Sequence, residues 1–177
     1  MTRLDPRAPY VLDTRELGRR PGTQRSVQRT VPAPEQLGVE LVAVPAGSDL
    51  ELTLRLEAVM EGVLLTGTAR APVVGECARC LERIEDDFVV DLQELYVYPN
   101  SGATQDEAAR LEEDLLDLEP LLRDAVVLAL PFSPLCSPDC SGLCVECGVR
   151  LADEPEHTHE APTDPRWAAL QDLTGGG

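Results

Sequence analysis

The chain has 177 residues, enough for one domain with a sizeable hydrophobic core. Its net charge is −17, and all 15 of its basic residues are arginine, so the chain taken whole repels phosphate. Apolar residues make up 43% but aromatic residues only 3%, which predicts a core of leucine, valine and alanine, and no apolar stretch approaches the length of a membrane span.

The first 30 residues carry charge of the opposite sign. They hold three acidic residues against seven arginines: Arg3, Arg7, Arg15, Arg19, Arg20, Arg25 and Arg29. Such a segment could contact RNA while the acidic remainder meets a basic protein, for example a ribosomal protein. It could equally be a solvated surface, and both interpretations stay open. Residues 10–13 are predicted to form a short strand, followed by a turn at residues 20–22.

The middle of the chain predicts antiparallel strands. Residues 50–57 alternate strictly between leucine and polar residues, which is typical of a strand with one buried face. A turn at Glu61 and Gly62 leads into a second β-rich run over 63–70, and alternation returns from Phe88 to Tyr98. Cys77 and Cys80 therefore fall at the tip of a β-hairpin.

A helix should follow an acidic loop over about 99–114. Asp117 can cap it, apolar residues recur at helical spacing from Leu118 to Ala129, and Pro131 ends it. We expect this helix to cover the sheet. Near the C-terminus, Asp164 and Pro165 predict the start of a short terminal helix that contains Trp167, the sole tryptophan. Trp167 is expected to anchor the tail in a groove, on its own body or on a partner.

The fold class is therefore α+β: an antiparallel sheet or meander covered by one main helix, then a zinc-knuckle segment and a short terminal helix. We expect a single domain over 1–177. Its parts are the arginine-bearing segment 1–48, the sheet and helix 49–131, the cysteine and histidine segment 132–160, and the tail 161–177.

The cysteines indicate a metal site. Cys77 and Cys80 form one Cys-x2-Cys pair, and a second run holds four more cysteines followed by two histidines: Cys136, Cys140, Cys144, Cys147, His157 and His159. A two-residue gap lets both thiolates reach one ion at about 2.3 Å, and Gly148 permits the left-handed backbone of such a turn. Thiolates alone would also suit an iron–sulfur cluster, but the added imidazoles favour zinc.

Eight ligands make two tetrahedral sites. Proximity in sequence suggests Cys144, Cys147, His157 and His159 as one site, which leaves Cys77, Cys80, Cys136 and Cys140 for the other. We therefore expect two zinc ions, or one if the histidines are only solvated. Disulfides are disfavoured because the N-terminus has no apolar signal region, which also predicts a cytoplasmic protein. A thioredoxin-like redox pair would need a helix in a parallel-sheet pattern, which neither pair has.

The order of these motifs resembles a known family. The Cys-Ala-Arg-Cys-Leu motif from Cys77, the helix ending in Leu-Ala-Leu-Pro, the run from Pro134 to Gly148 and the final Asp-Pro-Arg-Trp are similar to the bacterial YceD family, the large ribosomal RNA subunit accumulation proteins. The resemblance covers nearly the whole chain. It implies a role in the synthesis or accumulation of 23S ribosomal RNA without catalysis, and a Cys-x-Cys pair where this chain has His157 and His159.

Three classes of function compete. We favour a non-catalytic zinc-binding factor for large-subunit assembly, whose partner is ribosomal RNA, a large-subunit ribosomal protein or a pre-ribosome. The alternative is a zinc-bearing nucleic-acid-binding or regulatory module, which would need a basic face with interleaved aromatic residues. An enzyme is disfavoured because four thiolates close a zinc site to water, and no nucleophile–base pair or phosphate loop is evident. Neither a membrane nor a small-molecule substrate is expected.

Overall fold

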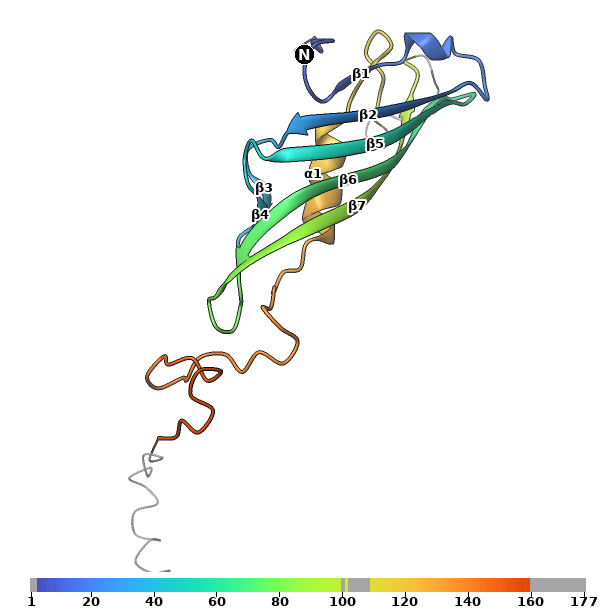
Figure 1. Ribbon diagram of the computed structural model, residues 1–177. Helices are drawn as coiled ribbons and strands as arrows, with labels where there is room; N and C mark the ends of the chain where they lie inside the picture. Colours follow the sequence, from blue (N-terminus) through green and yellow to red (C-terminus); the bar gives the residue numbers. More distant parts are fainter. Residues whose placement is uncertain (1–2, 100, 102–108, 160–177) are drawn as a thin grey trace, which may run out of the picture.

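The structure is a computed structural model that describes residues 3–99, 101 and 109–159. It consists mostly of antiparallel β-sheet with one α-helix (Figure 1). The elements are β1 (Val11–Asp13), the 3-10 helix η1 (Arg15–Leu17), β2 (Gln24–Pro32), β3 (Leu37–Val39), β4 (Val42–Val44), β5 (Asp49–Ala58), β6 (Gly62–Glu76), β7 (Arg83–Val97), β8 (Leu115–Asp117) and α1 (Glu119–Ala129).

Strand β6 is the centre of the main sheet. It pairs with β7 from Gly62↔Val97 to Glu76↔Arg83 along one edge. Along its other edge it pairs first with β5 and then, near its end, with β4. Strand β2 extends the sheet beyond β5, and β3 extends it beyond β4. The two hairpins predicted from alternation are confirmed, and β6 and β7 run further toward the cysteine pair than the apolar pattern indicated.

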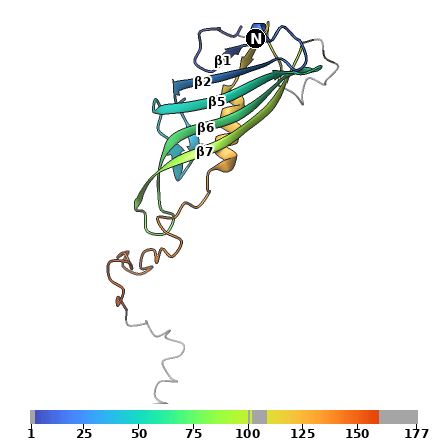
Figure 2. The ribbon, with the colours of Figure 1, turned by 45° about the vertical axis from the view of Figure 1, so that its right-hand side comes forward.

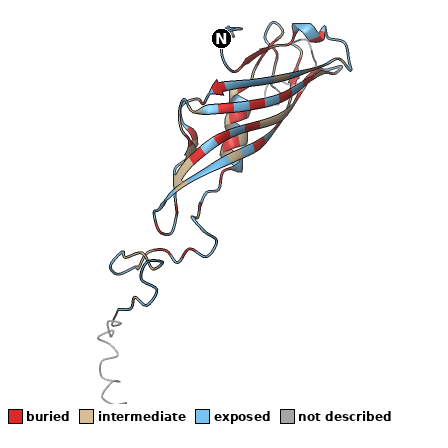
Figure 3. Ribbon diagram, in the orientation of Figure 1, coloured by how far each residue is buried: buried red, intermediate tan, exposed pale blue. Residues whose placement is uncertain are grey.

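The core lies on one face of this sheet. The four leucines of β5 are at most 2% exposed, whereas the residues between them face solvent. The same alternation is visible as red and blue bands along the strands in Figure 3. Leu122 and Val126 of α1 belong to the same apolar cluster, and α1 lies against this face in both ribbon views (Figures 1 and 2). Burial of these apolar side chains is the main force that joins helix and sheet.

The helix begins and ends near the predicted residues. The Asp117 carboxylate accepts a hydrogen bond from the Glu119 N–H at 3.0 Å, which satisfies one of the free donors of the first turn. The Tyr96 hydroxyl donates to the Asp117 carbonyl at 2.9 Å and ties this end to β7. Pro131 follows the helix after one residue. The terminal helix expected from Asp164, and Trp167 within it, lie outside the described residues.

The arginine-bearing N-terminal segment is part of the fold. Strand β2 pairs with β5 over nine residues, and β1 pairs with β8. Alternation alone did not predict β2, because arginine occupies two of the positions that face the core side. Arg25 and Arg29 lie opposite Leu56 and Leu52 in the register.

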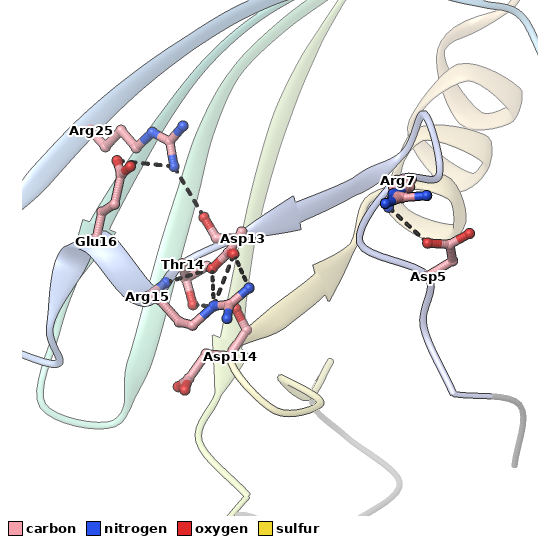
Figure 4. A network of polar contacts seen from close by, with 8 residues as sticks. All are labelled: Asp5, Arg7, Asp13, Thr14, Arg15, Glu16, Arg25 and Asp114. Atoms are coloured by element: carbon pink, nitrogen blue, oxygen red, sulfur yellow. Dashed lines mark hydrogen bonds and ion pairs between the residues drawn. The ribbon is translucent and has the colours of Figure 1, made fainter.

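These arginines bind the chain's own backbone and carboxylates. Arg29 donates to the carbonyl oxygens of Pro9 and Val11 at 3.1 and 3.4 Å, so it holds β1 beside β2. Figure 4 shows the network at the end of β1, where Arg25 meets Glu16 and the Asp13 carbonyl. Other ion pairs join Arg3 to Glu113, Arg15 to Asp13 and Arg19 to Asp114. Most arginines offered by the sequence as RNA contacts are therefore engaged within the protein.

No helix in the described part of the chain has the length and apolar character needed to cross a membrane.

Candidate metal centres

The first group of ligands is assembled at the tip of the β6–β7 hairpin. The Cys77 N–H donates to the Glu82 carbonyl at 2.8 Å, and the Leu81 N–H donates to the Cys77 carbonyl at 2.9 Å. These hydrogen bonds close a tight turn, and the thiols of Cys77 and Cys80 lie on the same side of it. The sequence prediction of a cysteine pair at a hairpin tip is confirmed.

The segment after α1 brings the other two cysteines to this turn. The Ala78 N–H donates to the Pro134 carbonyl at 2.8 Å, and Arg79 Nη1 donates to the Cys140 carbonyl at 2.9 Å. The two contacts bind the segment after α1, here called the linker (residues 130–143), to the hairpin on either side of Cys136. In both ribbon views the linker passes beneath the hairpin (Figures 1 and 2).

The four sulfur atoms of this proximal group, Cys77, Cys80, Cys136 and Cys140, lie within 4.8 Å of one another. Cys77 Sγ is 3.7 Å from Cys140 Sγ, and Cys80 Sγ is 3.6 Å from Cys136 Sγ. A tetrahedral ion with bonds of about 2.3 Å requires sulfur atoms about 3.8 Å apart, so the spacing fits one zinc ion. In a four-iron cluster each thiolate binds a different iron, and the sulfurs would have to stand further apart.

Three of the four cysteines of the proximal group are buried, and Cys136 is exposed. Cys77, Cys80 and Cys140 are buried, and the apolar side chains of Ile84, Leu135 and Leu143 pack against them. Burial by itself raises the pKa of Cys77, but the N–H groups of Cys136, Cys80 and Arg79 outweigh burial and lower it to about 6.

The Cys136 thiol resists ionisation within the proximal group. Hydrogen bonds from the Cys136 thiol to the sulfurs of Cys140 and Cys80 raise the pKa of Cys136 to about 12. The cluster therefore takes up one negative charge readily and resists the next, because like charges this close repel. A divalent ion removes this conflict by binding all four thiolates, which is the reason soft metals suit such a group.

The second, distal group contains Cys144, Cys147, His157 and His159. Cys147 Sγ lies 3.2 Å from His157 Nε2 and 3.3 Å from His159 Nε2, and the two Nε2 atoms are 2.9 Å apart. The Cys147 N–H lowers the pKa of Cys144 to about 6. Gly148 has φ of 75°, the left-handed conformation that the sequence analysis assigned to it.

The distal histidines are oriented by carboxylates. His157 Nδ1 lies 3.3 Å from Glu154 Oε2, and His159 Nδ1 lies 3.3 Å from Glu146 Oε2. An Nδ1–H bonded to a carboxylate leaves the lone pair of Nε2 free, and the two Nε2 atoms are the ones that face Cys147. Two lone pairs and two sulfurs that converge in this way fit a single zinc ion.

The structure thus brings all eight predicted ligands together in the two groups that the sequence analysis suggested. Residue spacing did not identify the neighbours of the ligands: Arg79 beside the proximal group, and Glu146 and Glu154 beside the distal one. A signal was available for the glutamates, because Glu154 precedes His157 by three residues and Glu146 stands between the distal cysteines. Their pairing with particular imidazoles depends on the loop conformation, which spacing does not give.

Fold and site define a class of protein: a main antiparallel sheet with a helix, and two clusters of cysteine and histidine at the hairpin tip and in the segment after the helix. The chain belongs to the YceD family, whose sequence profile, described as "Large ribosomal RNA subunit accumulation protein YceD", matches residues 65–174. The family recognised from the cysteine motifs is confirmed.

Mycobacterial proteins resemble the chain over almost its full length. A protein of Mycobacterium tuberculosis and one of Mycobacterium bovis, both described as uncharacterized, are each 49% identical over 172 residues, which is 95% of this chain and 83% of the relative. An uncharacterized protein of Mycobacterium leprae is 43% identical over 170 residues, or 94% of this chain and 78% of the relative. No solved structure matches the chain significantly.

Proposed function

We propose that the protein is a non-catalytic, zinc-binding factor of the cytoplasm that supports the synthesis or accumulation of 23S ribosomal RNA and the assembly of the large subunit. The observation that carries the ribosomal role is membership of a family described as large ribosomal RNA subunit accumulation proteins. The same membership supports a partner on the assembling large subunit, either its RNA or one of its proteins.

Zinc has a structural role in this proposal. The proximal ion joins the hairpin tip to the linker, two segments separated by more than 50 residues, and the distal ion closes the loop from Cys144 to His159. Closed tetrahedral sites of this kind contribute directly to folding. Four protein ligands leave no position for water or substrate, which supports a factor without catalysis.

A nucleic-acid-binding module is the alternative, and the arginines give it little support. Direct RNA binding would need free cations, and Arg15, Arg19 and Arg25 are paired with carboxylates. The net charge of −17 instead favours contact with a basic protein, whose positive surface it would attract.

The test is complementation. Cells that lack the chromosomal copy should accumulate less 23S relative to 16S ribosomal RNA, and the wild-type chain should restore the ratio. A Cys77→Ser variant should restore it only in part, while zinc measured on the purified variant falls by one ion. If deletion leaves the ratio unchanged, the ribosomal proposal is wrong. If the protein purifies without zinc, the metal proposal is wrong.

A pulldown from growing cells, with and without ribonuclease, separates the partners. Ribosomal proteins that disappear after ribonuclease treatment were held through RNA, and those that remain are direct partners.

A further inference from the structure

The core face of the sheet is longer than the helix that lies against it. Helix α1 ends at Ala129, but β6 and β7 continue to the hairpin tip. Beyond the helix, the core side of the sheet meets the linker that leads to the proximal cysteines. A cleft of about 500 Å³ opens between them. Its floor includes Val73, Ile84 and Phe88, and its wall includes Pro131, Pro134 and Leu135.

Asp86 and Asp87 both line the cleft, and of the two Asp86 is the one on the side of the apolar floor. Asp86 lies opposite Val73 in the β6–β7 register, and Val73 is only 6% exposed, so Asp86 stands on the core side of the sheet. Its neighbours on that side of β7 are Ile84 and Phe88, which also line the cleft. Asp87 is on the opposite face and is paired with Arg70 at 2.6 Å. Asp86 has no ion pair among the described residues, and no basic residue lines the cleft.

The rim of the cleft is also unusual. Phe132 stands between the lining residues Pro131 and Ser133 and is 76% exposed. Large apolar side chains exposed beside an apolar cleft are typical of a protein–protein contact. A charge on the inner side of an edge strand can also serve to prevent aggregation, but that role does not require a cleft.

We propose that this cleft, between Asp86 and the linker, binds an extended segment of a basic protein, which places an apolar side chain on the floor and a lysine or arginine against Asp86. The volume suits one or two large apolar side chains, and the carboxylate selects a cationic neighbour. The inference rests on the proposed function in one respect: the linker forms the wall, and the proximal zinc ion, through Cys136 and Cys140, holds the linker in place.

The experiment uses the full zinc-loaded chain and a fluorescein-labelled nonapeptide of alternating leucine and lysine, with binding followed by fluorescence anisotropy. A peptide of alternating leucine and glutamate is the control ligand. Asp86→Lys removes the proposed contact, and Asp91→Lys makes the same charge change on the same strand but on the outer face, where Asp91 lies opposite Thr68. Ser133→Trp fills the mouth of the cleft. All three positions are exposed, so the variants should fold.

We expect micromolar binding of the lysine peptide, and affinity roughly tenfold lower in the Asp86→Lys and Ser133→Trp variants but lowered less than about threefold in Asp91→Lys. An equal loss of peptide affinity in Asp86→Lys and Asp91→Lys would mean that only general charge attraction is involved, and it would overturn the proposal. So would the absence of binding to the wild-type chain. Binding that appears only after removal of residues 160–177 would assign the cleft to the chain's own C-terminal segment.

Zinc measured on the same samples separates the two proposals. If the chain holds zinc but peptide binding does not depend on Asp86, the docking inference alone fails. If the chain holds no zinc and still binds the peptide through Asp86, the metal proposal alone fails.

Discussion

Glu154 Oε2 lies 3.3 Å from His157 Nδ1, and this contact determines which nitrogen of the imidazole is offered to a metal ion. Removal of the negative charge by Glu154→Gln should free the ring to rotate or to change tautomer. We expect the affinity of the distal site for zinc to fall by about 10- to 100-fold, the usual effect of losing such a partner. Competition with a chromophoric chelator measures this directly.

Glu156→Gln is the matched control for that experiment. Glu156 is exposed in the same loop and is the same type of residue, but the carboxylate nearest to His157 belongs to Glu154. Equal affinities for wild-type, Glu154→Gln and Glu156→Gln proteins would mean that the carboxylate does not orient the imidazole.

The two groups of ligands should respond differently to loss of a cysteine. Cys77 is fully buried and its group joins two distant segments, whereas Cys147 is exposed and its group closes one local loop. Cys77→Ser and Cys147→Ser should each remove one zinc ion. Only Cys77→Ser should release the linker, which limited proteolysis would detect as new cleavage between residues 130 and 143. Identical digestion patterns for both variants would contradict a stapling role for the proximal ion.

Alternation of apolar and polar residues predicts some strands of this sheet and not others, for a physical reason. Strand β5 and the hairpin were predictable because each leucine of β5 faces the core and each residue between them faces water. Strand β2 was not, because Arg25 and Arg29 take positions on the core side that apolar residues would normally fill. Those arginines donate hydrogen bonds to backbone carbonyls of the N-terminal segment. Hydrogen bonds to the backbone produce no alternation of apolar and polar residues in the sequence.

The metal ligands were predictable because coordination restricts both residue type and spacing. The position of Asp86 in a cleft was not predicted, because it depends on the β6–β7 register and on a linker more than 40 residues away. The same holds for Glu146 and Glu154, whose partners are set by the fold of one short loop.

The core side of α1 can be tested within a single helix. Leu122 is fully buried, so Leu122→Ala should lower the free energy of unfolding by about 2–5 kcal/mol through lost burial and the cavity that remains. Leu128 is 81% exposed, and Leu128→Ala should change it by less than about 0.5 kcal/mol. Urea denaturation followed by circular dichroism measures both. Similar decreases in the free energy of unfolding for the two variants would mean that the helix does not pack on the sheet through the face that carries Leu122.

Two buried tyrosines should make the protein sensitive to high pH. Burial raises the pKa of Tyr10 to about 12 and also raises the pKa of Tyr96 above its usual range. Above about pH 10 the unfolded chain ionises these tyrosines while the folded chain still keeps them neutral. The stability they contribute is therefore fully present below pH 10 and is lost as pH rises toward the folded pKa values.

The loss should approach about 1.4 kcal/mol per pH unit for each tyrosine. Urea denaturation at several pH values between 9 and 11.5 gives the slope. Tyr96→Phe removes one of the two groups and should make the slope clearly shallower, although it also lowers stability at neutral pH through the lost bond to Asp117. A slope unaffected by this substitution would exclude Tyr96 as the source.

A structural role of the N-terminal arginines can be separated from RNA contact by experiment. Arg29 donates to the carbonyls of Pro9 and Val11, so Arg29→Gln should free the N-terminal segment and lower the free energy of unfolding by about 1 kcal/mol. Arg20→Gln makes the same chemical change nine residues earlier on an exposed turn and should leave stability unchanged.

Each variant is then tested for its ability to restore 23S ribosomal RNA in cells that lack the chromosomal copy. If these arginines are structural, accumulation should follow stability, so Arg20→Gln restores it fully and Arg29→Gln only as far as the variant stays folded. A variant that keeps its stability but fails to restore 23S ribosomal RNA would instead indicate that the substituted arginine contacts RNA.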